Sequence, residues 1–246
     1  MNGALLVGAL LVAKRELRAY VRSPFGWIVG AAMLLIDGLL FQGYALGGAP
    51  RLSADVLHDF FYFASGTTMV SAILLSMRLV AEERQTGTLV LLNTAPIPDA
   101  AIIAGKFVSA FVYLVLLTAL TVYMPLLVMV NGKVSGGHIA VGYLGLVLLG
   151  GAALSIGLFG SSLARSQVLA AIIGAGILVA MLVLWLVGRV TDPPFNAFLA
   201  GLSLHNDRFG PFMRGVLRLE NVVYYIAVTW FFLLASTKTL EARRWR

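Results

Sequence analysis

Six long apolar segments, separated by short polar connections, constrain the fold of this sequence more than any other feature. A helix needs about 20 mostly apolar residues to cross the hydrocarbon core of a bilayer, and all six segments approach or exceed that length. Only 12% of the 246 residues are charged, about half the share found in soluble domains. We therefore predict an all-α integral membrane protein, a single domain over residues 1–246 with six transmembrane helices. These are expected at about 25–46, 58–80, 102–130, 139–163, 168–187 and 221–237.

The N-terminal stretch predicts a helix that lies along the membrane surface. Its apolar part ends at Ala13, which makes it too short to cross a bilayer. Four basic residues follow, Lys14, Arg15, Arg18 and Arg22. At 100° per residue the apolar side chains form one stripe, with the basic ones on its flank and opposite face. We interpret residues 5–22 as an amphipathic helix that lies in the cytoplasmic interface; the alternative is the start of a first span.

The distribution of positive charge predicts the topology. With six spans, the connections on the side of the N-terminus hold 12 of the 18 lysines and arginines, and this excess lies beside the span ends. The positive-inside rule then places both termini in the cytoplasm. The net charge of +7 could suggest binding to nucleic acid, but basic residues placed beside apolar segments are explained by topology. We predict the lipid bilayer and no nucleic acid as a partner.

The connection after the second apolar segment, residues 81–101, is the longest polar run away from the termini. It begins with Glu82, Glu83, Arg84 and Gln85, which suit a water-exposed helical extension, and Arg78 and Glu82 have the i,i+4 spacing of a helical ion pair. A short apolar stretch and turn residues follow. Such a segment can lie in a groove of a soluble partner or on lipid headgroups, and periodicity does not choose between them.

Residues 192–220 predict a different element. Two short apolar stretches flank a polar turn at 205–208, and neither is long enough to cross a bilayer. This pattern favours a re-entrant or interfacial hairpin on the extracytoplasmic side, before the last span. A plain external loop is the alternative.

Asp37 is the one carboxylate predicted to lie near the middle of a span. Ionisable groups inside a membrane are costly, so such a residue is a candidate for function. Its other interpretation is structural, with the carboxylate facing a wet cavity or bonding a neighbouring helix. The sequence contains no P-loop, nucleophile elbow or HExxH motif, and no cysteine. We therefore predict no catalytic, metal-binding or cofactor-binding residues in this chain, and no enzyme.

Three stretches resemble the permease subunits of ABC-2 type transporters, most closely the group similar to the gliding-motility-associated permease. They are KRELRAYVRSPFGWIV (14–29), AEERQTGTLVLLNTAPIPDAAIIAGKF (81–107) and FMRGVLRLENVVYYIAVTWFFLLASTKTLEARRW (212–245). The resemblance extends over essentially the whole chain, and EERQTGTL is its most specific part. Asp37 stands where an uncharged residue is expected in such permeases, which suggests a more polar pathway here.

This resemblance implies a permease of the cytoplasmic (inner) membrane, and an exporter. Its partners would be two ATP-binding-cassette ATPase subunits, which would hold ATP and Mg, and a second permease chain, identical or paralogous. It also implies that the interfacial helix 5–22 is an elbow helix. The residues that would couple to the ATPase are Glu82, Glu83, Arg84, Gln85, Thr86 and Gly87. The alternative function is a self-contained proton-coupled transporter or channel that uses Asp37.

Overall fold

The computed structural model describes residues 2–45, 52–88, 98–132, 134–192 and 195–243. Within these ranges the chain is helical and has no strand, so the predicted all-α class is confirmed. Six of the described helices are long and apolar enough to cross a membrane. The elements are α1 (Asn2–Arg22), α2 (Pro24–Leu40), η1 (Phe41–Ala45), α3 (Ser53–Ser76), α4 (Ala81–Gln85), α6 (Asp99–Leu120), α7 (Tyr123–Asn131), α8 (Gly136–Leu163), α9 (Gln167–Val190), α10 (Phe195–Leu202), α11 (Asn206–Met213) and α12 (Leu219–Arg243).

The helix α8 forms the centre of the bundle and packs against α3, α6, α9, α11 and α12. Its middle is buried on all sides, as the fully covered Leu154 and Ile156 illustrate. Glycines let its neighbours approach closely. A Cβ atom at Gly160 would stand 2.7 Å from the backbone nitrogen of Gly174, so the backbones of α8 and α9 are in contact here. Small residues serve this purpose in membrane helix packing.

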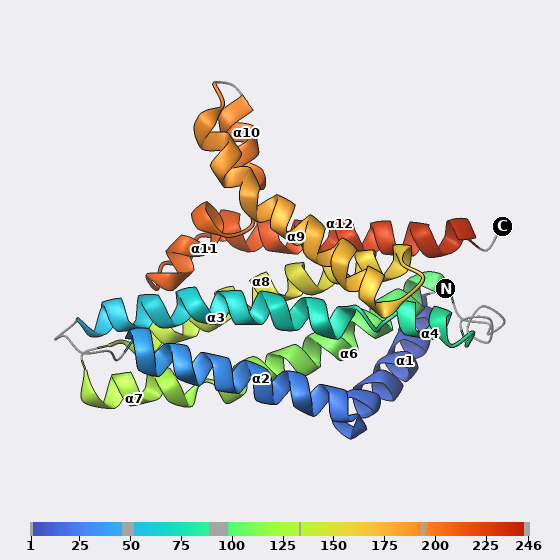
Figure 1. The fold of residues 1–246 in the computed structure, drawn as a ribbon, viewed down its shortest axis with the longest axis horizontal. Coiled ribbons are helices and arrows are strands. Elements are labelled where there is room, and N and C mark those ends of the chain that lie inside the picture. Colours follow the sequence, from blue (N-terminus) through green and yellow to red (C-terminus); the bar gives the residue numbers. More distant parts are fainter. Residues whose placement is uncertain (1, 46–51, 89–97, 133, 193–194, 244–246) are drawn as a thin grey trace.

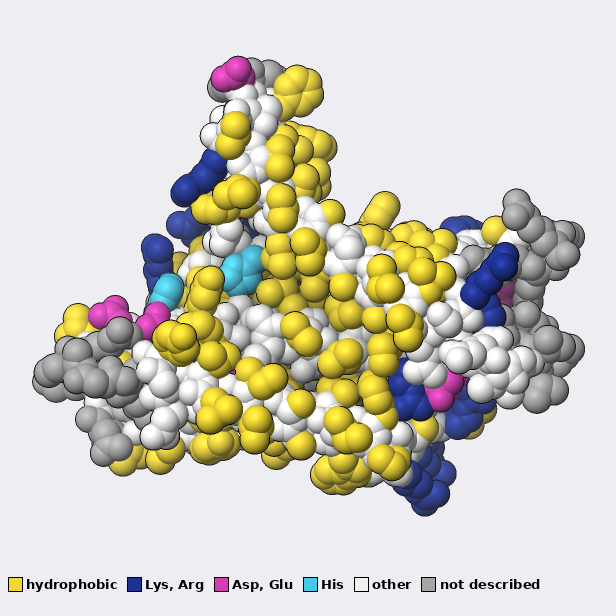
Figure 2. All heavy atoms as spheres, in the orientation of Figure 1, with side chains coloured by type: hydrophobic (Ala, Val, Ile, Leu, Met, Phe, Trp, Pro, Cys, Tyr) yellow, Lys and Arg dark blue, Asp and Glu magenta, His cyan; other side chains and the backbone are white. Residues whose placement is uncertain are grey.

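The outer surface of the bundle is apolar. Hydrophobic side chains cover its middle in Figure 2, and Lys and Arg gather at the end of the molecule that carries α1. The first and last helices both have their chain ends at this end (Figure 1). An even number of crossings produces that arrangement. Which side of the membrane this end faces stays a prediction.

The helix α1 runs steeply across the ends of the spans (Figure 1) and packs on α6. The chain turns at Ser23, whose hydroxyl accepts a hydrogen bond from the N–H of Phe25 at 3.3 Å and caps α2. Pro24 occupies the first position of α2, where its missing N–H costs nothing. The predicted elbow helix 5–22 is therefore a helix, and it begins at Asn2.

Several span boundaries differ from the predicted ones because helix ends are polar. The second span begins at Ser53 instead of 58, with Asp55 in its first turn, where a negative charge complements the helix dipole. The predicted third span is two helices, since the chain turns at 121–122. Pro125 has no N–H to donate to the carbonyl of Thr121, which explains the interruption. Part of the first predicted connection, 46–51, lies outside the described residues.

In the predicted segment 192–220, the described residues form two short helices, α10 and α11, before α12 begins at Leu219. The helix α10 packs along α9, and the two project together from the bundle (Figure 1). The helix α11 returns and buries Phe209 and Phe212 near Gly145 of α8. The entry of this segment into a bilayer stays a prediction.

Candidate functional site

The predicted coupling residues begin in the short helix α4, at the end of the molecule that carries both termini (Figure 1). The helix α4 has only five residues, too few for a stable isolated helix. Its four polar side chains contact the preceding turn, the helices α1 and α6, and the connection between α8 and α9. Contacts with the rest of the chain therefore hold this helix in place.

Glu83 contributes to a cluster of two carboxylates and two cations. Its Oε1 lies 2.8 Å from Nζ of Lys106 on α6 and 2.9 Å from a guanidinium nitrogen of Arg15 on α1. Glu16 contacts the same two cations, at 3.3 Å from Lys106 and 2.7 Å from Arg15. We call these four residues the ion-pair cluster. It joins α1, α4 and α6, although 68 residues separate Arg15 from Glu83.

The burial of Lys106 makes its pairing with these carboxylates necessary. The side chain of Lys106 is only 1% exposed, and a buried ammonium without a partner would be very costly. Burial raises the pKa of Glu16, but Lys106 and Arg15 outweigh that effect and leave the pKa below its usual value of 4.5. Both carboxylates are thus held where they neutralise the buried lysine. Lys106 lies inside the predicted third span, 102–130, and a lysine inside an apolar segment is a signal that it needs a partner. The sequence did not show which carboxylates supply it.

Glu82 ties α4 to the preceding turn and to the start of α2. Its two carboxylate oxygens each accept a 2.7 Å hydrogen bond from the guanidinium of Arg78. The predicted i,i+4 pair is therefore confirmed, and it has the two-pronged geometry that strengthens arginine–carboxylate contacts. The same guanidinium lies 4.6 Å from the centroid of the Phe25 ring, a cation–π contact.

Arg84 and Gln85 bind the connection between α8 and α9. The guanidinium of Arg84 donates to the backbone carbonyls of Ser162, at 3.1 Å, and Ala164. These carbonyls lie at the end of α8, where they have no partner within the helix. The side-chain oxygen of Gln85 accepts from the N–H of Gln167, the first residue of α9, at 3.5 Å.

Ser161 of α8 adds a contact that the sequence did not indicate. Its hydroxyl accepts from the N–H groups of Val80, at 3.1 Å, and Ala81, at 3.0 Å, and donates to the carbonyl of Met77 at 3.0 Å. It thereby caps the start of α4, where backbone N–H groups have no partner within the helix.

Thr86 and Gly87 end α4 and are exposed. Gly87 has a φ of +75°, the left-handed conformation that favours glycine after a helix. Four of the six predicted coupling residues, Glu82, Glu83, Arg84 and Gln85, thus contact the rest of this chain, whereas Thr86 and Gly87 face outward. The short apolar stretch predicted after them, 89–92, lies outside the described residues.

Asp37 lies on α2 and is 3% exposed. One carboxylate oxygen accepts a 2.6 Å hydrogen bond from the Thr67 hydroxyl of α3. The other, Oδ2, is buried and has no hydrogen-bond partner in the part of the chain that the structure describes. Asp37 therefore bonds a neighbouring helix, and one of its oxygens is left unsatisfied.

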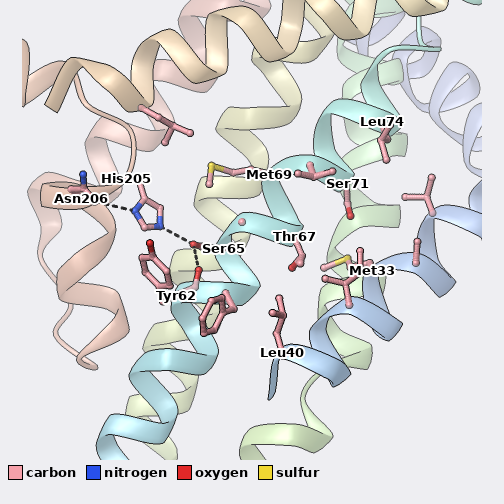
Figure 3. Close-up of a pocket in the computed structure, with 17 residues that line it drawn as sticks. Met33, Leu40, Tyr62, Ser65, Thr67, Met69, Ser71, Leu74, His205 and Asn206 are labelled. Carbon is pink, nitrogen blue, oxygen red and sulfur yellow. Dashed lines mark hydrogen bonds between the residues drawn. The ribbon is translucent and has the colours of Figure 1, made fainter. Parts of the chain in front are cut away.

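A cavity of about 570 Å³ lies beside this pair, between α2, α3, α9 and the start of α11. Figure 3 shows its lining, in which Ser65, Thr67 and Ser71 of α3 add hydroxyl groups to a mainly apolar wall. His205 closes one side; its Nε2 lies 2.7 Å from the Ser65 hydroxyl. Burial lowers the pKa of His205, and a contact with Asn206 only partly opposes that effect. The sequence placed His205 in a polar turn and gave no sign of this contact.

The described residues contain no group of three or more His, Cys, Asp or Glu side chains that could hold a metal ion. Glu82 and Glu83 contact separate partners, Arg78 and the ion-pair cluster. The side chains of α4 therefore connect this helix to α1, α6, α8 and α9.

The comparisons with known proteins agree with this architecture. Residues 10–196 match the family model described as ABC-2 family transporter protein. The matched region includes α1 from residue 10 onward, the ion-pair cluster, α4 and the cavity-lining parts of α2 and α3. No curated protein matches the chain. This chain therefore belongs to the ABC-2 family of transporter proteins, as a multi-pass membrane permease that partners with ATPase subunits.

Proposed function

We propose that this permease is an exporter of the cytoplasmic membrane. Two permease chains would form the translocation pathway above two ATPase subunits, which would hold ATP and Mg. The helix α4 and the residues that follow it, on the cytoplasmic side, would receive the movement of the ATPase. The observation that carries this proposal is the set of contacts from Glu83, Arg84 and Gln85, because they join α4 to α1, α6, α8 and α9.

These contacts provide a route for movement. In this proposal the ATPase engages the outward-facing Thr86 and Gly87 and the chain beyond them. A push on this surface displaces α4, and Arg84 transmits the displacement to the turn between α8 and α9. The ion-pair cluster transmits it to α1 and α6. The helices then move as packed bodies between two arrangements, as is common in switching proteins.

The cavity beside Thr67 is the proposed part of the pathway within one chain. Its walls come from α2, α3 and α9, and α9 contacts the proposed input through Gln85. A mainly apolar wall with a row of hydroxyl groups suits an amphipathic substrate better than a highly charged one. Movement of α9 against α3 would open and close this cavity, which fits outward transport of such a molecule.

Cross-linking can test the contact with the ATPase directly. The chain has no cysteine, so Thr86→Cys introduces a single thiol at the proposed surface. In membranes that contain the ATPase partner, this thiol should cross-link to an ATP-binding subunit, and added ATP should change the yield. Arg214→Cys, at an exposed position after α11, is the matched control and should give no such product. Equal cross-linking from both positions, or none from Thr86→Cys, contradicts the proposed docking surface.

A second candidate is a proton-coupled transporter, and one observation favours it. Asp37 is a buried carboxylate with an unsatisfied oxygen, one hydrogen bond away from the cavity. If this function is correct, the purified chain in liposomes moves substrate under a proton gradient without ATP, and Asp37→Asn abolishes the movement. If ATP and the ATPase are required, and Asp37→Asn transports normally, Asp37 is structural.

A further inference from the structure

The helix α1 has a second face that the ion-pair cluster does not use. Its inner face, with Val12, Ala13 and Tyr20, is buried. The outer face changes character along the helix. In the first half it is apolar and exposed, with Leu10 at 71% and Leu11 at 61%; in the second half it is basic.

The basic half is a regular stripe. Lys14, Arg18 and Arg22 are spaced four residues apart, so they follow one another along the same side of α1. All three are exposed. They form no ion pair or hydrogen bond with any of the described residues, whereas Arg15 on the same helix is paired with Glu16 and Glu83. The stripe therefore presents three cations that no acidic side chain among the described residues pairs with.

A hollow lies against this stripe. It is an open hollow between side chains of α1 alone, lined by Leu11, Lys14, Arg15, Arg18, Ala19 and Arg22. The indole of the exposed Trp27 lies beside the end of the stripe, with its N–H donating to the carbonyl of Val21 at 2.8 Å. Tryptophan is enriched at the level of lipid headgroups. Figure 2 shows the dark blue side chains of this end next to the hydrophobic belt of the bundle.

We propose that the outer face of α1 is a binding site for anionic phospholipid. The negatively charged headgroup occupies the hollow and contacts Lys14, Arg18 and Arg22. The exposed leucines of the first half insert among the acyl chains. A membrane lipid fits better than a soluble phosphate, because only a lipid satisfies both the cations and the adjoining apolar surface.

The size of the effect follows from the number of cations. A lysine or arginine near an anionic surface contributes about 1 kcal/mol, or about fivefold in binding. Loss of all three should therefore lower the preference for anionic lipid by about a hundredfold. High salt should weaken the preference in the unmodified chain as well, because exposed charges are screened.

Fluorescence quenching of Trp27 can measure this preference in the permease alone, so the result does not depend on the proposed coupling to an ATPase. The background is the full chain with Trp185→Phe, Trp230→Phe and Trp245→Phe, in lipid nanodiscs. Brominated phosphatidylglycerol and brominated phosphatidylcholine are the two quenchers, and their ratio gives the relative affinity beside the stripe. We expect phosphatidylglycerol to quench at a much lower mole fraction.

The decisive variant is Lys14→Gln/Arg18→Gln/Arg22→Gln, which should bring the two quenchers close to parity. The matched control, Arg214→Gln/Arg218→Gln, removes exposed arginines from the other end of the bundle and should keep the preference. Size-exclusion profiles verify that each variant folds. A preference that survives in the triple variant overturns the proposal. So does its loss in the unmodified chain on addition of millimolar glycerol phosphate, because the site would then bind a soluble anion.

Discussion

Lys106→Met tests whether the ion-pair cluster holds α1, α4 and α6 together. Methionine keeps most of the length and the apolar stem of lysine and removes its charge. Glu16 and Glu83 then face each other at the place where the ammonium lay 3.3 and 2.8 Å from them. The variant therefore separates the role of the charge from that of packing.

The expected loss is about 3 kcal/mol in the free energy of unfolding. Removing one partner of a buried ion pair costs about 3–5 kcal/mol, because a buried charge is left without compensation. The lower end applies here, since the two carboxylates are 17% and 13% exposed and Arg15 still contacts both. Adding Glu83→Gln removes one of the two opposed charges, so the double variant should recover about 1–2 kcal/mol of that loss.

Denaturant unfolding in mixed micelles, followed by the fluorescence of the four tryptophans, measures both values. Lys238→Met is the control, because Lys238 also pairs with a glutamate, Glu241 at 2.7 Å, but is 74% exposed. Lys238→Met should lower the free energy of unfolding by less than about 1 kcal/mol, because exposed ion pairs contribute little. The reasoning is refuted if Lys106→Met costs no more than this control. It is also refuted if the double variant loses the sum of the two single losses.

Four further results are expected. The pKa of Glu16 lies below 4.5 in the folded chain, so the stability that Glu16 contributes is complete above pH 4.5 and is lost as the pH falls further. Unfolding measured over a range of pH should show this loss in the unmodified chain and not in Glu16→Gln. Gly105→Ala would place a Cβ atom 2.6 Å from the carbonyl oxygen of Ala9. It should lower the free energy of unfolding by about 1–3 kcal/mol, because α1 is forced away from α6. At Gly176 an added Cβ meets nothing within 4 Å, so Gly176→Ala should change that free energy by less than about 1 kcal/mol. Arg84→Lys keeps the charge but not the fork that reaches two carbonyls, so it should lower the ATPase activity of the complex severalfold while the chain stays folded; unchanged activity would remove Arg84 from the proposed route. Burial lowers the pKa of His205, so as the pH falls the unfolded chain binds the proton before the folded chain does. The free energy of unfolding should therefore decrease below about pH 6.5. Hydrogen exchange at α11 should then rise more in the unmodified chain than in His205→Gln.

The membrane-embedded class and the six spans could be predicted from local sequence. Whether a segment can cross a bilayer depends mainly on the summed transfer free energy of its own residues. The Arg78–Glu82 pair was equally local, because the geometry of one helical turn brings the two residues together. The boundaries were less accurate: Ser53 and Asp55 begin a span with polar residues that a hydropathy average does not detect.

The roles of the coupling residues required the tertiary structure. The sequence identified Glu83 and Arg84 as candidates, but their partners are Lys106 and the carbonyls of Ser162 and Ala164. These partners are distant in sequence and meet only because the start of α6 and the end of α8 lie at the same end of the bundle. The sequence could not show what surrounds Asp37 either, because its partner Thr67 lies on another helix. Local residues determine which helices form, whereas the partner of a buried charge depends on how those helices pack, and many helix pairings share the same apolar pattern.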